Sequence, residues 1–272
     1  WQLHHVQCGI KLLCKMSGDM DLVLTAKGPL DRVHSYYHGV IPRTDFHMHS
    51  EFSECSSDTS IEKNVARARS VGLERIAITD HGLVYRPEWI RSYFQKIEEV
   101  RKWNGMDILT GMECDIDSEG HPVVSSEVLD EFDVIIGALH GLPSYRPSGE
   151  RFTYLPPEER VLEEYRREAL SALSSGWMRI LAHPTDIGWG KILIPDHILE
   201  EVASALSRSN VAVEINFHHR DPSIPMLEKC ISHGVHLTPV SDAHSLSEIG
   251  RFKWHRSIVA KLRTHHILWL TI

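Results

Sequence analysis

The sequence predicts an α/β fold in which seven strands alternate with helices along a chain of 272 residues. One observation is a series of short apolar runs rich in β-branched residues. Another is that stretches with helical spacing of apolar residues separate these runs. The runs are nearly continuous in apolar character, as buried parallel strands are. The alternation fits a closed β/α barrel, and an open doubly wound sheet is the alternative.

The apolar runs give the predicted strands, which span residues 44–49, 74–81, 107–113, 133–140, 178–183, 211–216 and 235–244. Between the first two, Thr59 and Glu62 form a capping box that begins a helix, and Gly72 ends it. Pro87 begins the second helix. Three more helices are predicted over 156–176, 195–210 and 224–234.

Residues 1–43 lie outside this alternation. They are predicted to be an N-terminal extension of uncertain structure, whether a hairpin, an extended arm or a disordered segment. Residues 44–272 are predicted to form the β/α barrel domain.

The composition is that of a globular protein, with 42% hydrophobic and 24% charged residues. A formal net charge of −8 argues against binding of long nucleic acids, which needs a basic surface. The five cysteines are odd in number and contain no Cys-x-x-Cys pair, which favours a reducing, cytoplasmic compartment. No apolar run approaches the roughly 18 residues of a membrane span, so no membrane partner is predicted.

Metal-binding residue types gather where the predicted strands end. His47 and His49 are two positions apart, so both side chains point to the same face of the first strand. In a parallel β/α fold the carboxyl ends of all strands share one face. A single histidine at a strand end is more often structural, but six strands here end in such residues: His47, His49, Asp80, His81, Glu113, His140, His183, Asp242 and His244. Strand 211–216 is less clear. Histidines elsewhere, such as His255, show no such pattern.

This donor set predicts a metal centre at the strand ends. Imidazole and carboxylate ligands suit zinc, manganese or iron. Eight or nine ligands exceed the four of a tetrahedral site, so two or three divalent ions are expected.

The chain resembles the PHP family, the polymerase and histidinol phosphatase superfamily. The resemblance rests on six motifs in the family's order: HMHSEFS, IAITDHG, LTGMECDI, GALHG, LAHPTD and VSDAHS. It implies a distorted seven-stranded β/α barrel that hydrolyses phosphoesters at a di- or trinuclear metal site. It also implies that Glu113 bridges ions and that the other ligands are His47, His49, His81, His140, His183, Asp242 and His244.

The loop after the first strand departs from the family pattern. The family usually has a further Asp or His five or six residues after the second histidine, and this chain has Glu54 and Cys55 there. Glu54 is the first choice as a ligand, because its carboxylate could replace that of the usual Asp. Cys55 is the second choice, because a thiolate also binds zinc well. Asp58 is the last. The alternative is that the loop only packs.

The predicted activity is hydrolysis of a small phosphomonoester, as in histidinol phosphatases, with a metal-bound hydroxide as the nucleophile. Arg220 and Arg146 are predicted to bind the phosphate, and Arg151 lies in the same segment as Arg146. Either His218 or His219 is a candidate to protonate the leaving group. The alternatives are a nucleotide phosphatase or nuclease for short substrates, and an inactive PHP-like binding module.

Overall fold

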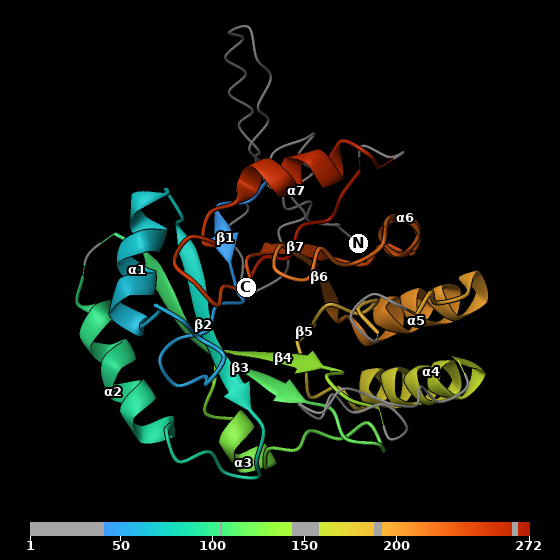
Figure 1. Cartoon of the computed structure of the whole chain (residues 1–272), viewed down its shortest axis with the longest axis horizontal. Coiled ribbons are helices and arrows are strands. Elements are labelled where there is room, and N and C mark those ends of the chain that lie inside the picture. The colour runs from blue at the N-terminus through green and yellow to red at the C-terminus, as the bar shows by residue number, and fades with distance from the viewer. Residues whose placement is uncertain (1–40, 104, 143–157, 188–191, 263–265) are drawn as a thin grey trace, which may run out of the picture. The chain divides into compact units, whose positions relative to one another are not determined.

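The structure, a computed structural model, describes residues 41–103, 105–142, 158–187, 192–262 and 266–272. Its strands form one parallel sheet in which each strand neighbours the next in sequence (Figure 1). The strands are β1 (Thr44–Asp45), β2 (Arg75–Gly82), β3 (Asp107–Asp115), β4 (Val134–Ala138), β5 (Ile180–Leu181), β6 (Ala212–Asn216) and β7 (Leu237–Val240). The predicted extension, residues 1–43, falls almost wholly outside the described part of the chain.

The sheet closes on itself just beyond β1 and β7. Met48 and Ala243 form a parallel bridge. The N–H of His49 donates to the carbonyl of Ala243 at 3.1 Å, and the N–H of Asp242 donates to the carbonyl of His47 at 2.8 Å. These bonds satisfy groups that an open sheet would leave at its edges. The predicted distorted barrel is therefore confirmed, and the open doubly wound sheet is wrong.

The predicted helices are present, and two short ones were not anticipated. The helices are α1 (Ile61–Ser70), α2 (Ile90–Arg101), α3 (Ser126–Leu129), α4 (Glu158–Ser175), α5 (Asp196–Ser209), α6 (Ile224–Ser232) and α7 (Phe252–Val259). The cap of α1 is Ser60, whose hydroxyl accepts from the N–H of Lys63, so the prediction of Thr59 was one residue early. The helices α3 and α7 were not predicted.

Several strands are shorter than predicted because the backbone turns away near the predicted metal ligands. His183 has φ 25° and Asp242 has φ 51°, both in a region that residues with a Cβ rarely adopt. A β-strand cannot continue through such a residue, so β5 and β7 end before these two positions. Strained backbone of this kind is often found at functional sites.

The barrel interior is filled by small and branched side chains from several strands. Phe46, Ala77, Ile136 and Ile180 are fully buried there, and Leu270 near the C-terminus packs against the same cluster. This packing excludes water from the body of the barrel, so it is a core and not a pore. The predicted metal ligands at the carboxyl ends of the strands are thereby held on a rigid base.

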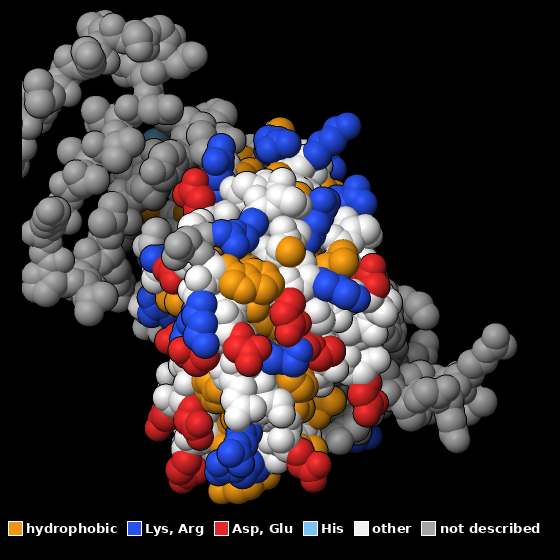
Figure 2. All heavy atoms as spheres, turned by 90° about the vertical axis from the view of Figure 1, so that its left-hand side faces the viewer, with side chains coloured by type: hydrophobic (Ala, Val, Ile, Leu, Met, Phe, Trp, Pro, Cys, Tyr) orange, Lys and Arg blue, Asp and Glu red, His pale blue; other side chains and the backbone are white. Residues whose placement is uncertain are grey.

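Among the described residues, no helix is long and apolar enough to cross a membrane. Figure 2 shows one face of the molecule, in the region of α1 and α2, where acidic and basic side chains are interspersed. No single sign of charge dominates this view of the described residues.

Candidate metal centre

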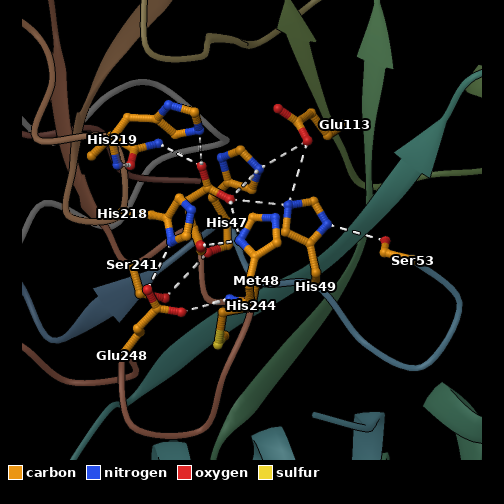
Figure 3. A network of polar contacts seen from close by, with 12 residues as sticks. His47, Met48, His49, Ser53, Glu113, His218, His219, Ser241, His244 and Glu248 are labelled. Atoms are coloured by element: carbon orange, nitrogen blue, oxygen red, sulfur yellow. Dashed lines mark hydrogen bonds and ion pairs between the residues drawn. The ribbon is translucent and has the colours of Figure 1, made fainter. Parts of the chain in front are cut away.

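Glu113 contacts several of the predicted ligands, and Figure 3 shows one of its oxygens beside the imidazoles of His47 and His49. Its Oε2 lies 3.3 Å from His47 Nε2, 3.5 Å from His49 Nε2 and 2.9 Å from His81 Nδ1. In the sheet, His81 and Glu113 are direct neighbours on β2 and β3. The sequence order of the strands therefore brings residues from three strand ends to one carboxylate oxygen.

The other oxygen of Glu113 faces a second group. Its Oε1 lies 3.2 Å from His140 Nε2 and 3.3 Å from His183 Nε2. A carboxylate whose two oxygens face different sets of nitrogen donors has the geometry of a ligand shared between two ions.

Asp242 supplies a second central carboxylate. Its Oδ1 lies 3.0 Å from His49 Nε2, and its Oδ2 lies 3.4 Å from His219 Nε2. His183, His219 and Asp242 form one group of donor atoms within 4.8 Å of one another, and His49, Asp242 and His244 form another. His219 therefore joins the predicted donors.

Three central atoms are placed as ligands of a cation and not as hydrogen-bond partners of one another. The Nε2 of His47, the Nδ1 of His81 and the Oε2 of Glu113 are buried and have no hydrogen-bond partner among the described residues. Two donors that are each about 2.1 Å from a zinc ion lie about 3.0–3.4 Å apart. The nitrogen–oxygen distances around Glu113 are close to that separation. The residues present therefore fit divalent ions.

The hydrogen bonds of Ser53 indicate which nitrogen of His49 is free. The Ser53 hydroxyl donates to Asp80 Oδ1 at 2.7 Å, so it accepts from His49 Nδ1 at 3.1 Å. That bond assigns the proton to Nδ1 and leaves the Nε2 lone pair facing Asp242 Oδ1. Two acceptors that face each other in a buried site need a cation between them.

Carboxylates outside the cluster bind the Nδ1 atoms of two other imidazoles. The Nδ1 of His47 donates to Glu214 Oε2 at 2.9 Å, and the Nδ1 of His140 donates to Asp115 Oδ1 at 2.6 Å. The Nδ1 of each ring is thereby occupied, and Nε2 points inward. Such outer carboxylates orient imidazole ligands and raise their basicity.

The electrostatics of the cluster favour positive charge. Burial lowers the pKa of His47, but the carboxylates of Asp242 and Glu113 outweigh burial and raise its pKa well above the usual value. Burial also opposes protonation of His81, yet Glu113 raises the pKa of that imidazole to about 10. Divalent ions would take the place of these protons. His49 differs, because burial lowers its pKa to about 3 and keeps the ring neutral.

The loop after β1 brings the thiol of Cys55 to the cluster. Cys55 and Glu54 are both exposed, but the Sγ of Cys55 lies in a donor group with His49 and His81. Partial burial raises the pKa of the Cys55 thiol, but hydrogen bonds with His244 and His81 outweigh it and lower the pKa to about 6. Asp58 instead accepts from the N–H of Leu246 at 2.8 Å. The geometry thus favours the second of the three predicted loop ligands.

The two candidate acids have different surroundings. His219 is 14% exposed, and its Nδ1 contacts the carboxylate of Asp186. His218 is 36% exposed, stacks on His244 with ring centroids 4.3 Å apart and donates from Nδ1 to Glu248 Oε1 at 2.7 Å. Figure 3 shows both rings beside the cluster.

Of the two predicted phosphate-binding arginines, only Arg220 lies among the described residues. The guanidinium of Arg220 stacks on Phe217 at 3.7 Å and lies 5.1 Å from the ring of Trp254. Among the described residues, Arg220 makes no ion pair or hydrogen bond with the cluster. Arg146 and Arg151 lie outside the described residues.

Sequence reasoning missed two roles. Glu214 is fully buried and accepts from both His47 and the N–H of His183, so it orients donors from two strands. Its position in the middle of the sixth predicted strand was the available signal. His255 is also buried, and its Nε2 lies 2.9 Å from the carbonyl of Ile215, which is a structural role in α7.

The PHP domain family matches residues 45–218, which is more than half of the chain. The chain belongs to the PHP domain family. That finding confirms the resemblance drawn from the six motifs.

Relatives with curated names include a probable phosphatase of Caldicellulosiruptor bescii, which is 29% identical over 74% of this chain and 80% of its own length. A probable phosphatase of Caldicellulosiruptor saccharolyticus is also 29% identical, over 82% of this chain and 88% of its own.

Among solved structures, the histidinol phosphate phosphatase of Lactococcus lactis, complexed with zinc, L-histidinol and phosphate, matches with a TM-score of 0.64. It is 23% identical and covers 84% of this chain and 96% of its own. The putative histidinol phosphatase of Listeria monocytogenes has the same TM-score at 13% identity and covers 78% of this chain and 99% of its own. At these identities the two structures support the shared fold.

Proposed function

We propose that this PHP-domain protein is a metal-dependent phosphatase that hydrolyses small phosphomonoesters of the histidinol phosphate type. The observation that carries the proposal is the convergence of imidazoles from separate strand ends on Glu113 and Asp242, with central atoms that lack hydrogen-bond partners. The names of the curated relatives support the enzyme class. The Lactococcus lactis structure, with its zinc, L-histidinol and phosphate, supports the metal and substrate classes.

The proposed ligands are the inward-facing donors described above, with Glu113 shared between ions: His47, His49, Cys55, His81, Glu113, His140, His183, His219, Asp242 and His244. Two or three divalent ions at these positions would supply an activated water as nucleophile and offset the negative charge of the phosphate. The outer carboxylates Glu214 and Asp115 fix the imidazoles, so the centre is organised before substrate binds.

His218 is proposed to face the substrate, and His219 to hold metal. The Nδ1 of His218 is occupied by Glu248, and Nε2 of this partly exposed ring has no hydrogen-bond partner among the described residues, so it can meet a leaving-group oxygen. His219 is more buried, and its Nε2 faces Asp242. The phosphate contact of Arg220 stays a prediction, because its described contacts are with aromatic rings.

The function is tested by phosphate release from a panel of substrates: histidinol phosphate, a generic aryl phosphate, mononucleotides and a short oligonucleotide, each with added manganese or zinc. We expect turnover of the small monoesters. His47→Ala and Asp242→Ala should each lower kcat/KM at least about 100-fold, because each removes a central donor.

A matched control is His197→Ala, which changes an exposed histidine at the start of α5 and should leave turnover unchanged. Hydrolysis of the oligonucleotide alone would favour the nuclease alternative. Unchanged turnover in both donor variants, or a protein without bound metal after chelator-free purification, would contradict the proposal.

A further inference from the structure

Cys55 lies at the edge of the metal centre, where imidazoles surround its thiol. The Sγ of Cys55 and nitrogen atoms of His49 and His81 all lie within 4.8 Å of one another. Two imidazoles, from beyond β1 and from β2, therefore meet one sulfur atom. The ring of His244, from beyond β7, lies beside them, with its centroid 4.5 Å from that of His49.

The two residues that follow Cys55 in the loop hold it in place. The hydroxyl of Ser56 donates to the carbonyl of Ser50 at 2.6 Å. The N–H of Ser57 donates to the carbonyl of His244 at 2.9 Å. These bonds tie the loop to itself and to the segment after β7, so the thiol is positioned before an ion binds.

A buried oxygen without a hydrogen-bond partner faces the same rings. The Oε2 of Glu113 is unpartnered among the described residues, and Glu113 is 1% exposed. It lies 2.9 Å from His81 Nδ1 and 3.5 Å from His49 Nε2. The thiol and this unsatisfied carboxylate oxygen thus share His49 and His81 as neighbours.

We propose that the thiolate of Cys55, together with His81, binds a thiophilic divalent ion of the zinc class at the outer edge of the centre. The neighbouring nitrogens of His49 and His244 complete the surroundings of that ion. This inference rests on the proposed function, because it assumes a metal centre at this site. It adds that the thiolate, a soft ligand, makes one position of the centre selective for its metal.

The selectivity follows from ligand chemistry. Thiolate with imidazole favours zinc or cobalt, whereas carboxylate-rich positions also accept manganese. The position at Cys55 should therefore discriminate against manganese, and the position between Glu113 and Asp242 should discriminate less. A preparation in manganese alone would leave the Cys55 position weakly occupied.

The test uses cobalt(II) as a spectroscopic probe in place of zinc. The full chain, with Cys8→Ser and Cys14→Ser as background, is stripped of metal and titrated with cobalt(II) under anaerobic conditions. The remaining thiols outside the loop, Cys114 and Cys230, are buried. We expect a thiolate-to-cobalt charge-transfer absorption in the near ultraviolet, which Cys55→Ser abolishes.

Two further measurements use the same proteins. Zinc saturation should slow alkylation of Cys55 by iodoacetamide, as followed by mass spectrometry, and a chelator should reverse the protection. Cys55→Ser should weaken the outermost zinc about 10- to 100-fold and leave manganese affinity unchanged. The matched control, Glu54→Gln, changes the neighbouring exposed side chain and should leave the absorption and the zinc affinity as they were.

The outcomes separate this inference from the proposed function. The charge-transfer band without phosphatase activity would support the thiolate ligand and contradict the function. Phosphatase activity without the band, and with equal alkylation in the presence and absence of zinc, would overturn the inference and leave the function standing. Loss of zinc affinity in Glu54→Gln instead of Cys55→Ser would assign the loop ligand to Glu54 and also overturn it.

Discussion

Two adjacent histidines after β6 have different environments, although the sequence did not distinguish their roles. The Nδ1 of His218 is bound to Glu248 at 2.7 Å, and that of His219 to Asp186. Their Nε2 atoms differ, because that of His219 lies 3.4 Å from Asp242 Oδ2, whereas His218 is 36% exposed at the rim. The same residue type can therefore act as a metal ligand at one position and contact substrate at the next.

Replacing each histidine by asparagine tests this division of roles. Asparagine keeps a donor near the place of Nδ1 and removes Nε2. We expect His218→Asn to keep its bound metal and to lose about 100-fold or more in kcat, because the leaving group loses a proton donor. His219→Asn should lose metal, as measured by elemental analysis of the purified protein. Metal loss in His218→Asn with full metal content in His219→Asn would reverse the assignment.

At the scale of single elements, β3 positions the central carboxylate by lying very close to its neighbours. Gly111 precedes Glu113 by two residues, and a Cβ at this glycine would lie 2.5 Å from Thr79 Cγ2 on β2. The carbonyl oxygens of Ile78 and Val134 would be only 3.1 and 3.2 Å away. A side chain there has no space, so glycine allows the close contact of β2, β3 and β4.

We expect Gly111→Ala to destabilise the fold by roughly 1–3 kcal/mol through overpacking, as measured by urea unfolding. The double variant with Thr79→Ser should recover part of that loss, because serine lacks the methyl group that the new Cβ meets. Serine also keeps the hydroxyl that accepts from the N–H of Met48 at 3.1 Å. Additive losses in the double variant would show that the methyl contact is not the cause.

At the scale of the whole molecule, metal binding links stability to pH. In the metal-free protein, Glu113 raises the pKa of His81 to about 10 against burial, compared with an ordinary value of 6.5. A group with a raised pKa in the folded state contributes stability that is fully present below 6.5 and is lost as pH rises through 10. Bound divalent ions replace the proton and remove this dependence.

We therefore expect chelation to lower Tm, and the difference in Tm between metal-loaded and metal-free protein to widen from pH 7 to pH 9. For each proton released the free-energy difference grows by at most about 1.4 kcal/mol per pH unit. Differential scanning calorimetry at several pH values, with a fixed free-metal concentration, measures this change. A difference that narrows over this range would contradict the proton-for-metal exchange.

The sequence by itself determined the order of strands and helices and the chemical types at the strand ends. Apolar runs of strand length leave few alternatives, and parallel strands place their carboxyl ends on one face whatever the loops do. His47, Glu113 and Asp242 were predicted to lie together for that reason, and the structure places His47 Nε2 3.3 Å from Glu113 Oε2 and 3.5 Å from Asp242 Oδ1. Their binding of metal stays a prediction.

Only the tertiary structure decided closure, side-chain direction in the loops and the roles of buried partners. The bridge between Met48 and Ala243 joins segments nearly 200 residues apart, which no local pattern encodes. Loops lack a periodicity that fixes which side chain points inward, so only the fold shows that the Sγ of Cys55 lies beside His49 and His81. Such long-range contacts exist only once the chain has folded, and this is why the strands were predictable and the direction of the loop side chains was not.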